Sequence, residues 1–302
     1  MAKSIFTTSH KMRILKNFIY TAAVTLCFLS CVGQKANAGQ LYNGWNYSID
    51  AFDDGSGGAV YDIKGIAIKE SGDKVYVALT GGMPLNGTMH DSVHIGWGDL
   101  FFNFSGQNFQ TASQTGQLFA VKFADYDGSL STGVYQKVTA KSVTAEHDGY
   151  TSLKAYYNAG FNKSNTQGTD LATLQQVYNY YYPTAIAQNP TTNNTPILNV
   201  IASGTKVGNI SLLGANELTT AGLDFGHFSA AGSQTIGFAF DKASIGTGSY
   251  IASLYLECGN DGVALKGEIK STPEPTATAG LVIFTVGFGA VQIRKRQKGV
   301  LA

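Results

Sequence analysis

Carboxylates gather in one short glycine-rich segment, residues 50–58. It contains Asp50, Asp53 and Asp54 beside three glycines. Calcium takes six to eight oxygen ligands from flexible loops, and glycine lets backbone carbonyls turn towards such an ion. The segment is not an EF-hand, because that loop needs a glutamate at its twelfth position and residue 61 is a tyrosine. The three aspartates are therefore a candidate calcium site, and the other interpretation is a turn whose Asp side chains bond their own backbone.

A second carboxylate pair of the same kind, Asp125 and Asp127, precedes Gly128. Oxygen-rich external loops often hold calcium, so calcium is the candidate cofactor of both segments.

Two histidines, His90 and His94, lie four residues apart with Asp91 between them. On a helix, imidazoles at this spacing can share one zinc ion, as in His-Glu-x-x-His proteases. The flanking glycines leave a segment too short for a secure helix, and on a single strand the two residues would lie about 13 Å apart. We expect surface-loop histidines here. The alternative, a zinc-dependent hydrolase, needs a third ligand within reach.

Other catalytic patterns are sparse. Cys258 is the only cysteine beyond residue 31, and a catalytic thiol would need a nearby histidine. Neither a Gly-x-Ser-x-Gly elbow nor a Gly-x-x-x-x-Gly-Lys loop occurs. We expect Cys258 to be a small buried residue and the protein not to be an enzyme. Aromatic residues that could instead stack on sugars are assigned to core packing; they are Trp45, Trp97, Tyr178, Tyr180, Tyr181 and Tyr182.

The first 38 residues have the order of a secretory signal peptide. A basic leader with Lys11, Arg13 and Lys16 precedes an almost wholly apolar or small run, residues 18–32. Ala36 and Ala38 form a small-x-small site before Gly39. The run is short for a permanent membrane span, so we expect signal peptidase to remove this leader.

The C-terminal end, residues 271–302, has three ordered parts. Pro273, Glu274 and Pro275 come first, and residues 276–293 carry no charge. A basic cluster follows at once, formed by Arg294, Lys295, Arg296 and Lys298. An uncharged run of this length can just span a bilayer, and basic residues behind it stay on the cytoplasmic side.

This order resembles the PEP-CTERM sorting signal of Gram-negative and cyanobacterial surface proteins. The resemblance implies that exosortase recognises the Pro-Glu-Pro motif, and that a transmembrane helix holds the chain in the inner membrane until cleavage. The part between the two ends is similar to a cyanobacterial group of exosortase-dependent surface proteins, which implies export but no particular chemistry. The segments that carry this similarity are residues 47–50, 53–54, 65–69, 98–104, 118–119, 141–143 and 257–262.

Composition limits the partners of the ectodomain, residues 39–270. With the next two residues included, it holds twelve lysines, no arginine and nineteen Asp or Glu, so negative charges exceed positive ones by seven. Because bidentate binding of phosphate relies on arginine, nucleic acid is not an expected partner. An acidic surface suits an external location.

Alternation of apolar and polar residues predicts a mainly β fold. The expected strands are residues 45–50, 60–69, 75–79, 100–104, 118–123, 133–142, 151–157, 197–201, 208–213, 235–240, 250–257 and 263–269. One short helix is expected at 169–182, capped by Thr169 and stopped by Pro183. Many short strands with glycine-rich turns favour a single β-sandwich or jelly-roll-like ectodomain.

Together these patterns predict a precursor anchored in the membrane and then released to the cell surface or extracellular matrix. Its expected role there is structural or adhesive rather than enzymatic. The main alternative is a secreted module that binds calcium or an extracellular polysaccharide.

Overall fold

The computed structural model describes residues 39–51, 54–125, 130–159, 166–189 and 194–271. Within this part the chain is mainly β, with 41% of residues in strands and 19% in helices. This confirms the mainly β character expected from the alternating pattern.

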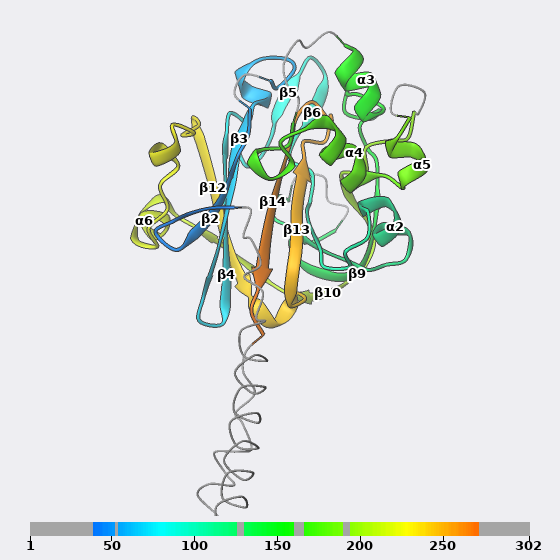
Figure 1. Cartoon of the computed structure of the whole chain (residues 1–302). Coiled ribbons are helices and arrows are strands. Elements are labelled where there is room, and N and C mark those ends of the chain that lie inside the picture. Colours follow the sequence, from blue (N-terminus) through cyan, green and yellow to red (C-terminus); the bar gives the residue numbers. More distant parts are fainter. Residues whose placement is uncertain (1–38, 52–53, 126–129, 160–165, 190–193, 272–302) are drawn as a thin grey trace, which may run out of the picture. The chain divides into compact units, whose positions relative to one another are not determined.

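Two six-stranded antiparallel sheets form the body of the fold (Figure 1). The first sheet has the order β1 (Gln40–Tyr42), β2 (Trp45–Ile49), β3 (Ile63–Ser71), β4 (Lys74–Gly81), β12 (Gln234–Asp241) and β11 (Ile210–Leu213). The second has the order β10 (Val200–Gly208), β9 (Gly133–Lys141), β8 (Leu118–Lys122), β7 (Leu100–Asn103), β13 (Gly248–Tyr255) and β14 (Gly262–Ile269). A small hairpin pairs β5 (Thr88–His90) with β6 (Val93–Ile95).

Turn chemistry fixes the register of the hairpins. Ser71 pairs with Lys74, so Gly72 and Asp73 make a two-residue turn between β3 and β4. Gly72 has a φ of 62°, which a glycine adopts without strain. The strands expected at 60–69 and 75–79 therefore pair as a hairpin.

The central core lies between the two sheets. It joins side chains of the first sheet, such as Ile66, Val77 and Phe238, to side chains of the second, such as Phe102 and Leu254. Each of these large side chains is fully or almost fully buried. Burial of one such side chain contributes about 1.5–3 kcal/mol, so this cluster is the main source of cohesion between the sheets.

Helices cover the outer faces of both sheets (Figure 1). On the second sheet, Phe101 and Tyr255 pack against residues of α2 (Phe109–Gln114), α3 (Leu153–Asn158), α4 (Leu174–Tyr181) and α5 (Thr184–Ala187). On the first sheet, Trp45 and Tyr47 pack against α6 (Ala215–Thr220) and the 3₁₀ turn η3 (Phe225–Phe228). The central strands of each sheet are therefore covered on both faces, whereas the edge strands β10 and β11 remain largely exposed.

The expectation of one helix is wrong, since the described residues contain five α-helices. The strand predicted at 151–157 is α3, because the Ser152 hydroxyl caps Ala155 N–H and starts a helix. The helix predicted at 169–182 begins only at Leu174, where Thr173 and Gln176 form a capping box. Thr169 starts a separate 3₁₀ turn, η2 (Thr169–Leu171).

Other predicted strands have shifted bounds. The strand expected at 197–201 begins at Val200 and continues to Gly208, and the one expected at 208–213 is β11. No helix among the described residues is long and apolar enough to cross a membrane. The predicted span and basic cluster, the Pro-Glu-Pro motif and the signal peptide with Ala36 and Ala38 lie outside the described residues.

Candidate cation site

Three buried aspartates converge from distant parts of the chain. Asp50 follows β2, Asp54 lies in the loop after it, and Asp261 lies in the turn before β14. One carboxylate oxygen from each lies within 4.8 Å of the others. Their exposed fractions are 4%, 1% and 2%. Three acids thus meet at one interior position, two from the chain that follows β2 and one from the turn before β14.

Hydrogen bonds fix the orientation of the Asp261 carboxylate. Its Oδ2 accepts from the backbone N–H of Ile63 at 2.6 Å, and its Oδ1 accepts from Gly262 N–H at 2.7 Å. Asp50 Oδ1 accepts from Ala51 N–H at 3.0 Å, while its Oδ2 has no hydrogen-bond partner in the described part of the chain. The Asp54 backbone carbonyl accepts from the Tyr156 hydroxyl. Hydrogen bonds therefore hold all three residues in position, and two of these residues are bonded to distant parts of the chain.

The cluster concentrates negative charge in a poorly solvated place. Burial raises the pKa of the Asp50 carboxyl well above its usual range, and the charges of Asp261 and Asp54 raise it further. Burial likewise raises the pKa of Asp261, followed by the charges of Asp54 and, to a smaller extent, Asp62. Hydrogen bonds from Ile63 and Gly262 act in the opposite direction. Burying carboxylates together is unfavourable unless a proton or a cation offsets their charge.

A small cavity adjoins the carboxylates. Its volume is about 10 Å³, which is close to the space that one water molecule needs. Gln167 faces this cavity, is 2% exposed, and neither atom of its side-chain amide has a hydrogen-bond partner among the described residues. The lining residues are Asp54, Tyr156, Thr166, Gln167, Tyr255, Asp261 and Gly262.

The segment that carries Gln167 joins the two sheets. Its backbone carbonyl accepts from Ala264 N–H of β14 at 3.1 Å. Two residues on, the Thr169 hydroxyl accepts from Ile49 N–H of β2 at 3.4 Å. The intervening Gly168 donates to Asp50, and its φ of 78° brings the backbone close to Ser48. The acidic cluster therefore lies at a seam between the first and second sheets.

The sequence identified two of these three acids. Asp50 and Asp54 belong to the cluster, whereas Asp53 lies outside the described residues. The sequence does not single out Asp261, because Asn-Asp-Gly is a common turn sequence and lies far along the chain from the other two acids. Gln167 was also missed, since an isolated glutamine in a loop gives no pattern. Of the second carboxylate pair, only Asp125 is among the described residues, and it is not part of this cluster.

His90 and His94 occupy neither the helix nor the single strand considered for them. They lie on opposite strands of the β5–β6 hairpin, whose turn begins at Asp91 with a φ of 50°. His90 Nδ1 is 3.2 Å from Asp148 Oδ2, and His94 Nε2 is 2.8 Å from the Asn86 carbonyl. The group of ligating side chains found in the described part of the chain includes neither histidine.

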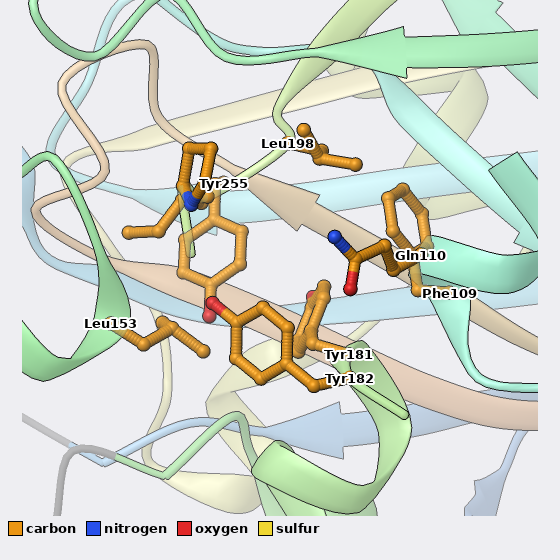
Figure 2. Close-up of a pocket in the computed structure, with 9 residues that line it drawn as sticks. Phe109, Gln110, Leu153, Tyr181, Tyr182, Leu198 and Tyr255 are labelled. Atoms are coloured by element: carbon orange, nitrogen blue, oxygen red, sulfur yellow. The ribbon is translucent and has the colours of Figure 1, made fainter. Parts of the chain in front are cut away.

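The remaining candidates are structural. Cys258 is fully buried, as expected for a small core residue, and burial raises the pKa of its thiol to about 12. The aromatic residues considered for sugar stacking are at most 7% exposed, which confirms core packing. Figure 2 shows Tyr181, Tyr182 and Tyr255 around a second small cavity, together with Phe109, Leu153 and Leu198. These tyrosines form part of the helix-covered core.

An open groove of about 560 Å³ lies between α6 and the first sheet. Its two charged residues already have partners: Lys69 Nζ donates to the Ala221 carbonyl at 2.7 Å, and Glu217 Oε2 accepts from Gly214 N–H at 2.7 Å. The groove and the acidic cluster share no lining residue.

Comparison with known proteins finds no matching family model, no matching curated protein and no matching solved structure. The assignment therefore depends on the chain's own residues.

Proposed function

We propose that this chain is an exported surface or extracellular-matrix protein with a structural rather than a catalytic role. The observation that carries the proposal is the ordered C-terminal sequence of Pro273-Glu274-Pro275, an uncharged stretch and a basic cluster, combined with a signal-peptide pattern at the other end. Signal peptidase and exosortase would be its processing partners, and the inner membrane would hold the precursor.

The geometry of the described part supports the structural role. Enzyme sites usually combine an open concave pocket with titratable groups of shifted pKa. Here the two carboxyls whose pKa is raised well above its usual range, Asp50 and Asp261, are buried, and the open groove beside α6 does not contain them. The two sheets with a shared core support a β-sandwich, and the pairing of β4 with β12 and of β7 with β13 interlocks its halves in a jelly-roll-like way.

The test is the intact mass of the protein recovered from its native host. The expected mature species begins at Gly39 and lacks the uncharged stretch after Pro275. A variant with Pro273→Ala, Glu274→Ala and Pro275→Ala should remain uncut and stay in the membrane fraction.

A matched control, Ser271→Ala with Thr272→Ala, changes the two preceding residues and should be processed normally. If the native protein keeps residues 276–302 and the triple variant behaves identically, sorting by exosortase is refuted. If the leader remains attached, export by signal peptidase is refuted.

A further inference from the structure

The acidic cluster and the glutamine beside it contain buried polar atoms that have no hydrogen-bond partner in the described part of the chain. Asp50 Oδ2 is buried without a partner in the described part of the chain, and so is the whole side-chain amide of Gln167. Buried polar groups are almost always paired in native proteins, so two neighbouring exceptions call for an explanation. Gln167 Nε2 lies against the backbone that follows Asp261, 2.9 Å from the position that a Cβ on Gly262 would occupy.

We propose that Asp50, Asp54, Asp261 and Gln167 form a calcium-binding site that fastens the first sheet to the second. The limit of 4.8 Å between the carboxylate oxygens equals about twice a calcium–oxygen bond of 2.4 Å, which places all three within reach of one ion. The cavity beside them has room for a single small sphere. Export and sorting do not require this site, so the inference goes beyond the proposed function.

The ligand atoms select the class of metal. All of the proposed ligands offer oxygen, and carboxylates and amides suit hard cations rather than zinc or copper. Three carboxylates that bind through one or both oxygens, together with one amide, supply four to seven of the six to eight ligands that calcium takes. Magnesium usually retains several waters, and a cavity of about 10 Å³ does not hold them.

Gln167 can turn its oxygen towards the ion. The oxygen and nitrogen of an amide are assigned from hydrogen bonds, and this side chain has none in the described part of the chain. A flip exchanges the two atoms without moving the side chain. The segment around Gln167 is already bound to β2 and β14, so its position is set before an ion arrives.

The site would connect four segments: the end of β2, the loop that contains Asp54, the segment around Gln167 and the turn before β14. Asp54 and Asp261 are 207 residues apart in the chain. An ion that binds them together therefore stabilises the folded state and has no equivalent site in the unfolded chain.

The experiment uses the full-length chain in detergent, stripped with EGTA and then supplied with calcium chloride or magnesium chloride alone. Metal analysis after dialysis should find one calcium per chain. At a calcium concentration about a hundred times the dissociation constant, the melting temperature should rise by roughly 5–10 °C. Magnesium at the same concentration should produce a smaller shift.

Variants locate the ion. Asp261→Asn and Asp50→Asn should each abolish the calcium-dependent shift and lower calcium uptake at least tenfold, while Gln167→Leu should weaken uptake. The matched control is Asp170→Asn, because Asp170 is also buried and accepts from Lys266 N–H but lies outside the cluster. It should keep the full shift whatever its own stability.

The proposal is overturned if the stripped wild-type chain takes up no calcium, or if Asp261→Asn retains the shift. An equal response to magnesium would overturn the selectivity for calcium. Asp261→Asn removes repulsion but keeps only one acceptor oxygen for the N–H groups of Ile63 and Gly262, so circular dichroism in EGTA checks that it folds. Asp50→Asn is the second variant, because it keeps an oxygen for the Ala51 N–H.

Discussion

Neutralising one acid of the cluster should have opposite effects with and without calcium. In EGTA, the carboxylates of Asp50 and Asp261 repel each other without a cation between them. The ligand oxygens lie within 4.8 Å of one another, and two unit charges at that limit repel by about 3.5 kcal/mol at an effective dielectric constant of 20. Proton uptake relieves part of this repulsion, so Asp50→Asn should stabilise the calcium-free protein by about 1–2 kcal/mol at pH 8.

In calcium the order should invert. Saturation at a hundred times the dissociation constant adds about 2.7 kcal/mol to the wild-type chain and nothing to a variant that cannot bind. The wild type should then be the more stable protein. Urea denaturation followed by tryptophan fluorescence measures both conditions, because Trp45 and Trp97 are buried and should report unfolding.

A double variant sharpens the test. Once Asp50→Asn has removed one charge, Asp261→Asn should be less favourable in EGTA than it is as a single change, because one of the charges of the cluster is already gone. The surface control is Asp241→Asn, whose carboxylate is exposed and paired with Lys74 Nζ at 2.6 Å. It should change stability by less than about 1 kcal/mol, equally in both conditions. Lower stability of Asp50→Asn in EGTA, or the same order of stability in both conditions, would refute the repulsion argument.

Three further predictions concern the fold. Phe238→Ala should destabilise the protein by about 3–5 kcal/mol in urea denaturation, because Phe238 is fully buried and its ring stacks on that of Phe123 at a centroid distance of 5.0 Å. The control is Leu212→Ala, at the exposed residue of β11 that pairs with Phe238, and it should change stability by less than about 1 kcal/mol. Similar losses in the two variants would contradict the assigned core. Burial raises the pKa of the Cys258 thiol to about 12, so at pH 8 it should react with a disulfide reagent about a thousandfold more slowly in the native chain than in the unfolded chain. Rapid labelling of the native protein would show that the thiol is not buried. Thr173→Ala should cost about 1 kcal/mol by removing the cap of α4, while Thr173→Ser should retain most of the stability in the same assay.

Local patterns in the sequence predicted most strands but not the helices that cover them. Strand β2 alternates apolar and polar residues along its whole length, and period two is a strong indication of a strand. Residues 151–157 contain two neighbouring tyrosines that suit a strand, yet Ser152 caps the first turn and Leu153 and Tyr156 are buried on one face of a helix. Short helices of this kind depend on tertiary packing more than on propensity.

Only part of the candidate site can be predicted from the sequence. Asp50 and Asp54 were found because carboxylates and glycines are neighbours in the chain. Asp261 joins them only because the turn before β14 folds against the entrance to β3, where its carboxylate accepts from Ile63 N–H. Such a contact over 198 residues depends on the order of strands in the two sheets, which one sequence does not reveal.

The outer edge of β14 has a consequence for how copies of this chain can associate. Several of its outward backbone groups are already bonded: Ala264 N–H to the Gln167 carbonyl, Lys266 N–H to Asp170, and Lys266 C=O to the Asn46 amide. Just beyond the strand, Lys270 N–H is bonded to Glu70. A free strand edge invites another chain to extend the sheet, and proteins block such growth in several ways. Here side chains from the rest of the fold occupy the sites that an added strand would use. Growth of the second sheet by strand addition is therefore closed at β14, and within the described part of the chain its opposite edge is β10.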